Sequence, residues 1–477
     1  MINYEQLYIG GRWVAPTLDE RIEIRSPHDN SLVGHAAQAA PADVDAAVTA
    51  ARKAFDKGPW PTMRPEERRA LVARFDELHA ARAGEIAALI TAENGTPAWF
   101  TQSLQTAVAE QTAAYLRAAD RFGWEEETVG PTGAKTMLRR EPVGVVAAVI
   151  PWNAPHQSAL AKMIPALLAG CTVVLKVATE TPLDGLMLGE LFSEAGFPEG
   201  VVSILPADRE TSEYLVTHPD VDKIAFTGST RAGRRIASLA GEQLKRVSLE
   251  LGGKSASIVL EDADLETVAQ ATPFMAFVNN GQSCVAHTRL LVPRSRHEEF
   301  VSAIAAAAEK VTVGDPADPD NFVGPLVTAV QKERVQNYIQ SGLDEGARPV
   351  VGGLGAPEGF EQGNYVRPTV FADVDNSMRI AQEEIFGPVL VVIPYEDEDD
   401  AVRIANDSPY GLGGGVWTRD TARGLAVARR IRTGTFVVNG AAIGFDTPFG
   451  GYKASGVGRE FGAVGLSQYV EHKSIAL

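Results

Sequence analysis

Cysteine is scarce in this chain, which has only Cys171 and Cys284 among its 477 residues. Two cysteines in so long a chain exclude a disulfide framework and a cysteine-rich metal site. No bound metal is therefore predicted. Because disulfide-dense chains belong to oxidising compartments, the low cysteine content also makes a cytoplasmic location the default.

Basic residues and long apolar runs are lacking as well. The 44 Lys and Arg residues face 61 Asp and Glu residues, a formal net charge of −17. This balance disfavours nonspecific binding to nucleic acid or to anionic membranes. The apolar run 143–150 ends at Pro151 and is too short to span a bilayer. Residues 1–6 have neither the basic nor the apolar region of a signal peptide.

Hydrophobic residues make up 45% of the chain, which is enough to form sizeable cores. Its length suggests two or three domains at about 150 residues each. Apolar strands alternate with helical segments in its middle part. Strands are predicted at 143–150, 172–176, 201–205 and 223–226, with helices ending near Leu168 and covering 183–195 and 210–217. Such alternation favours a parallel sheet with both faces covered.

The same pattern starts again past residue 255. Strands are predicted at 257–260 and 289–292, and helices at 264–279, 297–310 and 329–345, whereas residues 40–120 are predicted to be largely helical. This restart predicts a second α/β domain from about residue 253. The segment 125–140 and the tail 469–475 have the composition of exposed strands, which often pair with a neighbouring subunit.

Two Gly-flanked segments carry the most informative chemistry. Cys284 ends the polar run Asn-Asn-Gly-Gln-Ser-Cys, and Glu250 lies upstream in Leu-Glu-Leu-Gly-Gly-Lys. A thiol and a carboxylate suffice for covalent catalysis followed by base-assisted hydrolysis. Taken alone, Cys284 would more often be an ordinary small buried residue.

Other segments suggest a ligand site, each with a plainer alternative. The strand, Gly turn and helix start at 226–233 suit a phosphate, although they lack the G-x-G-x-x-G fingerprint and also suit a plain N-cap turn. Lys176 ends a parallel strand, where ligands bind, or is simply solvated there. Asn153 offers an amide to an oxyanion, or forms a turn. Glu384 is a second carboxylate candidate, or a surface residue at a helix end.

Together these segments resemble the aldehyde dehydrogenase superfamily along essentially the whole chain, from Ile9-Gly10-Gly11-Arg12-Trp13 to the alternating tail. Six motifs follow the order and spacing of that family: Pro151-Trp152-Asn153, Phe226-Thr227-Gly228-Ser229, Glu250-Leu251-Gly252-Gly253-Lys254, Gly281-Gln282-Ser283-Cys284, Glu384-Ile385-Phe386-Gly387-Pro388 and Pro448-Phe449-Gly450-Gly451. Each is modest alone, but six in register make coincidence implausible.

The resemblance implies an α/β aldehyde dehydrogenase-like fold with three parts. These are a Rossmann-type cofactor-binding domain (1–119 and 143–252), an α/β catalytic domain (253–455) and a small β oligomerisation element (120–142 and 466–477). It also implies an active site in a tunnel between the two large domains, and assembly as a homodimer or homotetramer.

The reaction implied by the resemblance is the oxidation of an aldehyde to a carboxylic acid. The Cys284 thiolate would form a thiohemiacetal whose oxyanion is held by the Asn153 amide and the backbone N–H of Cys284. Hydride loss to the nicotinamide would leave a thioester, which water activated by Glu250 would hydrolyse. The residues that correspond to the cofactor-binding surface of the family are Ile150, Trp152, Lys176, Thr179, Gly228, Ser229, Glu384 and Phe386.

The cofactor side departs from the family pattern at Thr179. Many NAD-preferring relatives carry Glu there, and its carboxylate repels a 2′-phosphate. Thr179 removes that repulsion, so NAD is predicted with NADP left open; Lys176 and Arg209 are the candidates for a phosphate contact. Residues 206–212 also lack glycines that are often found at the adenine end.

The substrate side departs at Ala154 and Ala161, where relatives that prefer small aldehydes often carry large aromatic residues. Two alanines widen the tunnel, which predicts a medium or bulky aldehyde, whether aromatic, terpenoid or long-chain. Gln157, Ser283 and Phe449 are predicted to line the same pocket. His156 is predicted to lie in the pocket lining or on the surface, and not to act as the base.

Two rival functions remain. A CoA-acylating semialdehyde dehydrogenase is disfavoured because such relatives lack the residue that corresponds to Glu250. A non-catalytic binding protein on the same fold is disfavoured because Cys284, Glu250, Asn153 and Lys176 are all present.

Overall fold

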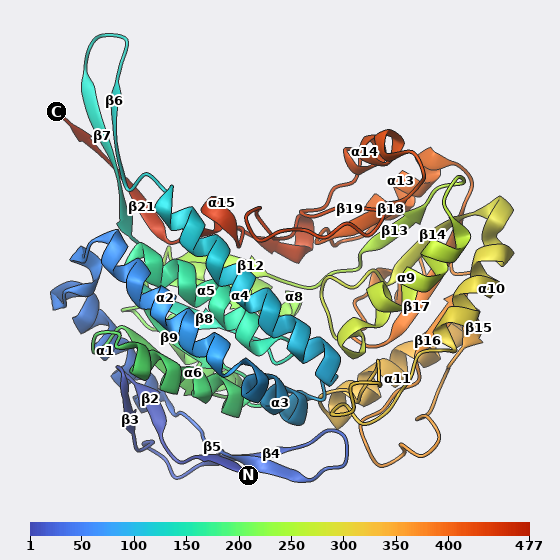
Figure 1. Cartoon of the computed structure of the whole chain (residues 1–477), viewed down its shortest axis with the longest axis horizontal. Helices are drawn as coiled ribbons and strands as arrows, with labels where there is room; N and C mark the ends of the chain where they lie inside the picture. The colour runs from blue at the N-terminus through green and yellow to red at the C-terminus, as the bar shows by residue number, and fades with distance from the viewer.

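The computed structural model describes all residues 1–477 as two α/β lobes with a projecting β-hairpin (Figure 1). One lobe is built on an eight-stranded sheet of order β20-β12-β11-β8-β9-β10-β2-β3. Its central strands β8 to β12 run parallel. The strands are β2 Leu7–Ile9, β3 Arg12–Val14, β8 Val145–Val149, β9 Thr172–Val177, β10 Val202–Pro206, β11 Lys223–Thr227, β12 Arg246–Glu250 and β20 Gly456–Val457.

Helices cover both faces of this sheet, as the buried strands predicted. On β8, Val146 and Ala148 face one apolar cluster, while Val145, Ala147 and Val149 face another. A strand buried on both faces needs an uninterrupted apolar run, which is why 143–150 lacks polar residues. The helices of this lobe are α1 Pro41–Lys57, α2 Pro65–Ala81, α3 Ala83–Asn94, α4 Ala98–Asp120, α5 Pro155–Ala169, α6 Pro182–Ala195, α7 Arg209–Thr217 and α8 Thr230–Glu242.

The second lobe is built on a seven-stranded sheet of order β15-β16-β17-β14-β13-β18-β19, in which only β15 runs antiparallel to its neighbour. Its strands are β13 Ala256–Val259, β14 Arg289–Pro293, β15 Arg348–Val351, β16 Thr369–Ala372, β17 Val389–Tyr395, β18 Gly414–Trp417 and β19 Val437–Val438. Its helices are α9 Leu265–Phe277, α10 His297–Ala308, α11 Ala329–Asp344, α12 Arg379–Gln382, α13 Glu398–Asn406 and α14 Thr421–Ala428.

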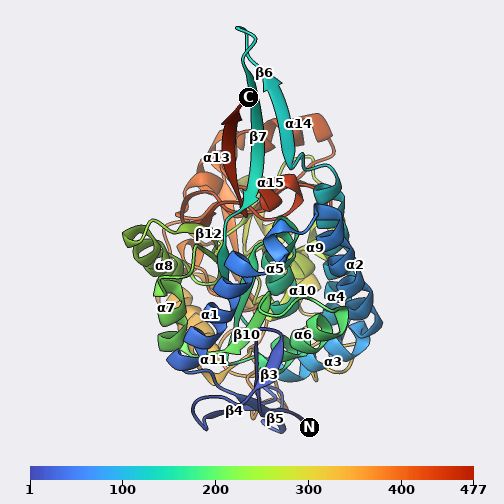
Figure 2. The same cartoon turned by 90° about the vertical axis from the view of Figure 1, so that its left-hand side faces the viewer.

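The two segments predicted to protrude pair with each other. Strands β6 Glu125–Val129, β7 Lys135–Pro142 and β21 Val470–Ala476 form an antiparallel sheet with β7 in the middle. Figure 2 shows this sheet projecting from the lobes, opposite the N-terminal strands β1 Ile2–Tyr4, β4 Arg21–Arg25 and β5 Leu32–Ala37. All five residues of β6 are exposed.

The predicted strands and helices are confirmed to within a few residues, as is the α/β class. The shortest strands were not predicted, because two or three residues carry no recognisable periodicity. None of the helices combines the length and the apolar character that crossing a bilayer requires.

The strand order places a topological switch beside β8. The chain runs from β8 to β9 on one side and later returns to β11 on the other. Ligands of open α/β sheets bind outside the carboxyl ends of the strands at such a switch. The segments 150–153 and 228–229 follow β8 and β11, so both lie at this point of the fold.

Candidate active site

Cys284 follows a sharp turn at the end of α9. In the short helix η2 Val278–Gly281, Asn279 and Asn280 have φ of 54° and 60°. Apart from Gly, Asn is among the residues that adopt this left-handed conformation most readily. The Asn280 amide donates to Gly95 O at 2.9 Å and Pro325 O at 2.8 Å. Gly281 packs against the backbone of Gly387, where a Cβ would not fit. These contacts fix the loop that presents the thiol.

The Cys284 thiol is partly buried and protonated in this state. Burial raises its pKa to about 12, and the carboxyl groups of Glu384 and Glu250 add to the shift. Both carboxyl groups are therefore within electrostatic reach of the sulfur. Only a base that removes this proton would make the sulfur a nucleophile.

Asn153 lies directly beside this loop. It follows β8, and its Nδ2 donates to Gln282 O at 2.9 Å. Only one hydrogen of that amide is used by a protein acceptor, so the second is available to an oxyanion. The predicted neighbourhood of Asn153 and Cys284 thus agrees with the geometry.

Glu250 is the last residue of β12 and has a buried side chain. Its Oε2 has no hydrogen-bond partner, and burial, followed by repulsion from Glu460, raises its pKa well above the ordinary value. The missing Cβ of Gly450, with φ of 147°, lets the loop approach: a Cβ there would lie 2.5 Å from Glu250 Oε1. The raised pKa favours the neutral form of the Glu250 carboxyl, so its ionisation needs a contact that stabilises the charge.

A buried ion pair beside Glu250 was not predicted. Lys162 on α5 donates to Glu460 Oε1 at 2.6 Å and to Thr227 Oγ1 at 2.5 Å. Lys162 attracts and Glu460 repels the charge on Glu250. One signal was available, since Lys162 interrupts the otherwise apolar run 159–169 of α5 and a buried Lys needs a partner. The position of that partner, near the other end of the chain, had no local signal.

Replacing Glu460 by Gln is therefore expected to lower the pKa of Glu250, because Gln keeps the shape but removes the repelling charge. The acid limb of the kcat–pH profile should move to lower pH. An acid limb that stays in place, with normal thermal stability, would contradict this coupling. Glu471→Gln, an exposed carboxylate near the same end of the chain, is the control.

The predicted cofactor residues gather at the ends of β8, β9 and β11. Ser229 caps α8 and accepts from Ala232 N at 3.3 Å. Burial lowers the pKa of Lys176 to about 8, offset by Glu180 and Asp208. Thr179 Oγ1 lies 3.3 Å from Glu180 Oε2. A helix N-terminus and a Lys at a strand end are features that suit a dinucleotide phosphate or ribose.

Glu384 and Phe386 belong to the second lobe and contact residues that follow β12 and β8 in the first lobe. Glu384 Oε1 accepts from Gly253 N at 2.8 Å, and Gly252 and Gly253 leave room for Glu384 and for Cys284 O, respectively. The Phe386 ring meets the Trp152 ring edge-on, with centroids 5.5 Å apart. Gly252 and Gly253 therefore bring the end of the strand that carries Glu250 against both the Cys284 loop and Glu384.

The residues predicted to line the substrate pocket lie mainly on α5. Ala154, Gln157 and Ala161 are spaced i, i+3 and i+7 and share one face of the helix. Tyr115 OH donates to Ala161 O at 3.1 Å and accepts from Phe461 N at 2.8 Å. Phe449 packs on Phe461 with centroids 5.7 Å apart. Ser283 is half-buried next to Cys284, and Ile150 is buried at the end of β8.

The predicted pocket or surface position of His156 is wrong. Its side chain is buried between α2 and α6: Nε2 lies 2.7 Å from Asp184 O, and Nδ1 lies 3.1 Å from His79 Nε2. A carbonyl only accepts, so His156 Nε2 donates, and His79 Nε2 must donate to His156 Nδ1. Burial lowers the pKa of His156 to about 4 and that of His79 to about 3.

These two histidines are expected to make the fold sensitive to acid. Both are neutral when folded but take up a proton below about pH 6.5 when unfolded, so their stabilisation is present above that pH and is lost as pH falls. At pH 5 the loss is about 4 kcal/mol for the pair. The double variant His79→Gln/His156→Gln should show a smaller drop in Tm between pH 7.5 and pH 5. An unchanged drop would contradict the assignment.

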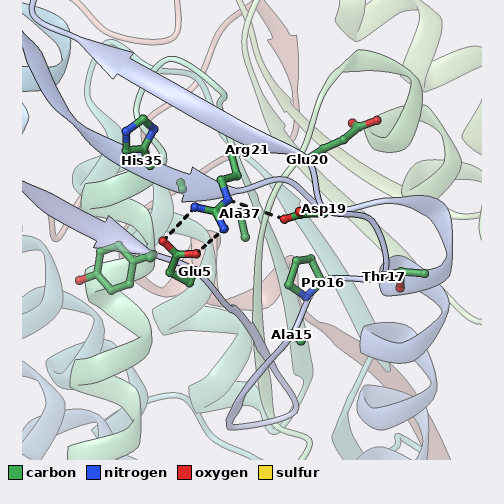
Figure 3. A pocket seen from close by; sticks show the side chains of 11 residues that line it. Glu5, Ala15, Pro16, Thr17, Asp19, Glu20, Arg21, His35 and Ala37 are labelled. Atoms are coloured by element: carbon green, nitrogen blue, oxygen red, sulfur yellow. Dashed lines mark hydrogen bonds and ion pairs between the residues drawn. The ribbon is translucent and has the colours of Figure 1, made fainter.

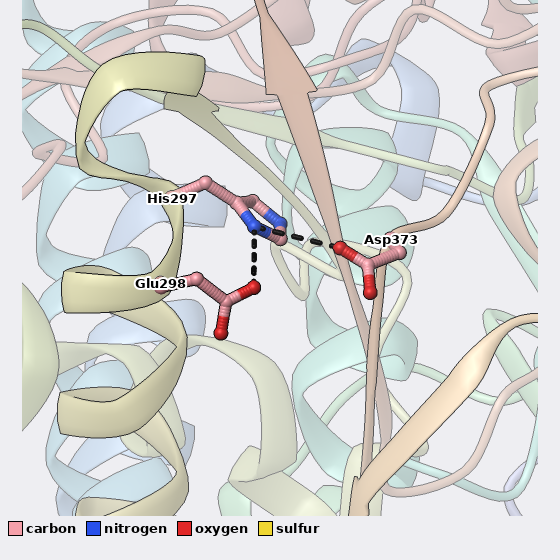
Figure 4. A group of neighbouring side chains, drawn as sticks. All are labelled: His297, Glu298 and Asp373. Carbon is pink, nitrogen blue, oxygen red and sulfur yellow. Dashed lines mark ion pairs between the residues drawn. The ribbon is translucent and has the colours of Figure 1, made fainter.

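Two other features lie outside this site. His297, Glu298 and Asp373 come together (Figure 4), but Arg348 pairs with both carboxylates, at 2.7 and 2.6 Å, so the cluster is a neutralised ion-pair network. A hollow of about 340 Å³ lies among the N-terminal strands (Figure 3). Its lining includes the Glu5–Arg21 pair and none of the predicted site residues.

Comparisons with known proteins agree with this architecture. The aldehyde dehydrogenase family model matches residues 13–475. Geranial dehydrogenase from Castellaniella defragrans is 45% identical over the whole of this chain and 99% of the relative. The 3-succinoylsemialdehyde-pyridine dehydrogenase of a Pseudomonas species is 42% identical, again over the whole chain and 99% of the relative.

Solved structures agree equally well. An aldehyde dehydrogenase from Mycobacterium tuberculosis, complexed with NAD+, superposes with a TM-score of 0.98 at 48% identity, over all of this chain and 98% of the other. A variant of aldehyde dehydrogenase C from Pseudomonas syringae, complexed with NAD+ and octanal, gives 0.94 at 42% identity, over 99% and 96%. The chain belongs to the aldehyde dehydrogenase family, and the predicted resemblance and fold are confirmed.

Proposed function

We propose that this enzyme oxidises an aldehyde to the carboxylic acid with NAD, through a covalent intermediate on Cys284 that is hydrolysed with Glu250 as base. The observation that carries the proposal is the convergence of three groups from separate elements. The Cys284 loop bonds directly to Asn153 at the end of β8, and the thiol lies in the electrostatic field of Glu250 at the end of β12.

The first step is attack of the Cys284 sulfur on the carbonyl carbon. The thiol proton leaves to a base, the C–S bond forms, and the carbonyl π electrons move to oxygen. In the proposed step the oxyanion accepts from two N–H groups that have no other recorded protein acceptor, the second amide hydrogen of Asn153 and the backbone N–H of Cys284. Stabilising charge where it develops is the largest contribution such donors make.

The fit of the remaining residues supports NAD. Ser229 and the helix start behind it suit a phosphate, and Lys176 and Glu384 suit ribose hydroxyls. NAD, when bound, accepts the hydride that leaves the former carbonyl carbon. Phe386 and Trp152 pack on each other beside these residues.

The second half of the reaction releases the acid. Once the acyl group is held on sulfur, ionised Glu250 takes a proton from water, whose oxygen attacks the acyl carbon. The C–S bond breaks and Cys284 leaves as a thiolate. Lys162 stabilises the Glu250 charge that this step requires.

For the cofactor, NADP is proposed as tolerated beside NAD. Thr179 lacks the carboxylate that would repel a 2′-phosphate, whereas Glu180 keeps a negative charge next to Lys176 and Thr179. The balance favours NAD.

For the substrate, we propose a medium or bulky aldehyde, of aromatic, terpenoid or long-chain type. Small side chains at Ala154 and Ala161 support it, as do the names of the geranial and pyridine-semialdehyde relatives and the octanal bound to a similar enzyme. A preference for bulky aldehydes would distinguish this enzyme from an acetaldehyde dehydrogenase.

Replacing Ala154 by Phe is expected to narrow the pocket. The value of kcat/KM should fall by roughly 10- to 100-fold for geranial or benzaldehyde but change little for acetaldehyde, since added volume in an apolar pocket discriminates by about that factor. Ala154→Ser is the matched control. An equal loss for all three aldehydes would contradict the position of Ala154 in the pocket.

We also propose a cytoplasmic homodimer or homotetramer whose subunits meet through the sheet of β6, β7 and β21, because β6 leaves an exposed edge. The domain boundaries given above belong to the same proposal. Light scattering of a chain that lacks residues 470–477, beside the full chain, tests the contact.

The experiment that tests the function is absorbance of reduced nicotinamide with NAD and NADP in parallel. The substrates are acetaldehyde, hexanal, benzaldehyde, geranial and succinic semialdehyde, without and with CoA. Turnover of the bulkier aldehydes without CoA supports the proposal. Turnover only with CoA favours the acylating alternative, and no turnover at all favours a binding protein.

A further inference from the structure

Residues 93–96, at the end of α3 and in the turn toward α4, contact the turn after β8, the Cys284 loop and the start of α6. Glu93, Asn94 and Thr96 are each at most 2% exposed. None of them takes part in the steps above. We propose that residues 93–96 form a clamp that positions the oxyanion donor Asn153 and the Cys284 loop, and that Thr96 is its decisive positioning residue. This inference rests on the proposed function.

Thr96 fixes the orientation of the Asn279 amide. Asn279 Nδ2 faces two carbonyl oxygens, Asn153 O at 2.8 Å and Gln282 O at 3.3 Å. Both are acceptors, so the amide must direct its NH2 group toward them. Its Oδ1 then faces Thr96 Oγ1, 2.7 Å away, and the hydroxyl must donate. Without that donor the buried Oδ1 is unsatisfied.

The Asn279 amide is the bridge between the two catalytic turns. One of its bonds reaches the backbone of Asn153 and the other reaches the loop that ends in Cys284. An amide free to rotate by 180° would place an oxygen against two oxygens and push the turns apart. The Thr96 hydroxyl prevents this rotation because it donates to Asn279 Oδ1.

The neighbours of Thr96 hold the same turns from the backbone side. Asn94 Nδ2 donates to Trp152 O at 3.0 Å, and Asn94 Oδ1 accepts from Thr96 N at 2.9 Å. Gly95 O accepts from Asn280 Nδ2 at 2.9 Å. Gly95 has φ of 75°, and a Cβ on it would lie 2.7 Å from Pro325 Cγ, so this position requires glycine.

Glu93 anchors the clamp to the core of the cofactor lobe. Its two carboxylate oxygens accept from Leu183 N and Asp184 N, each at 2.9 Å, at the start of α6. Burial raises the pKa of Glu93 to about 8, and these two N–H bonds oppose that shift because they stabilise the charged form. The clamp thus ties the nucleophile loop, the turn after β8 and the start of α6 into one rigid unit.

The test compares Thr96→Val, Thr96→Ser and Thr101→Val. Val keeps the shape of Thr but removes the donor; Ser keeps the donor. Thr101 is an equally buried Thr on α4 that bonds to Thr91 and Ala98 O, away from the site. Thr96→Val should lower kcat roughly five- to tenfold with KM for NAD unchanged, because one buried hydrogen bond is lost. Thr96→Ser should recover most of kcat.

Thermal stability separates a positioning role from a merely structural one. Thr96→Val and Thr101→Val should lower Tm to a similar extent, but only the former should lower kcat. Equal kcat in the two variants would overturn the clamp. Should Thr96→Val not fold, Asn94→Asp, which sets an oxygen against Trp152 O, must lower kcat in the same way, and a normal kcat there overturns the proposal.

Measuring kcat of Cys284→Ala beside these variants distinguishes failure of the clamp from failure of the proposed function. An inactive Cys284→Ala with a normal Thr96→Val refutes the clamp alone. An active Cys284→Ala refutes the proposed function and, with it, the role assigned to the clamp.

Discussion

Replacing Cys284 by Ala is expected to lower kcat on the order of 10⁴-fold or more, because no other group can form the covalent intermediate. The two carboxyl groups that act on the thiol, Glu384 and Glu250, lack the nucleophilicity of a thiolate. The loop itself should keep its shape, since Asn279, Asn280 and Gln282 hold it through contacts that do not involve the sulfur. Affinity for NAD, measured by quenching of intrinsic fluorescence, should be unchanged.

Cys171→Ala is the matched control. Cys171 is the other thiol of the chain, fully buried in the turn between α5 and β9, and burial raises its pKa to about 11. Its sulfur contacts Tyr469 O at 3.4 Å and no residue of the site. The Cys171 variant should retain wild-type kcat. Activity within tenfold of wild type in Cys284→Ala would refute the covalent mechanism.

The central part of the fold was predictable because two local signals coincide there. Strands β8 to β11 are mostly apolar, and the helices between them begin at Pro155, at Pro182 or after the cap Asp208. Two of these helices end at glycines with left-handed φ, Gly170 and Gly196. Local sequence patterns do not predict strands that pair with a segment distant in the sequence. Strand β20 has two residues and joins β12 only because the chain returns from the other lobe.

The candidate site likewise contains residues that local motifs predict and residues that they do not. Cys284, Glu250 and Asn153 were predictable because each lies in a Gly-containing or Pro-containing motif that the family resemblance orders. Glu460 and Thr96 have no motif of their own; they matter because folding brings them to Lys162 and to Asn279. His156 was misplaced because a polar residue near a helix start resembles a surface residue unless its partner, here His79 on a different helix, is known.

Replacing Glu250 by Gln is expected to separate the two halves of the reaction. Loss of a general base slows the step it serves by roughly 10²- to 10⁴-fold. If that step is hydrolysis, mixing the Glu250→Gln enzyme with aldehyde and NAD should release about one reduced nicotinamide per active site in a burst, followed by slow turnover. Intact-mass spectrometry should then find the acyl group on the protein. Hydroxylamine, an external nucleophile, should restore turnover.

The rate of the burst decides whether Glu250 also removes the thiol proton. The pKa of Cys284 is raised partly by the Glu250 carboxyl, so Gln should lower that pKa and ease ionisation of the sulfur. A burst as fast as the wild type's first turnover therefore assigns Glu250 to hydrolysis alone, whereas a burst slowed as much as turnover assigns it to both proton transfers. Alkylation by iodoacetamide as a function of pH gives the thiol pKa independently, because Cys171 is fully buried and does not compete. Full steady-state turnover in Glu250→Gln would remove Glu250 from the mechanism and leave the water-activating base to be sought at Glu384.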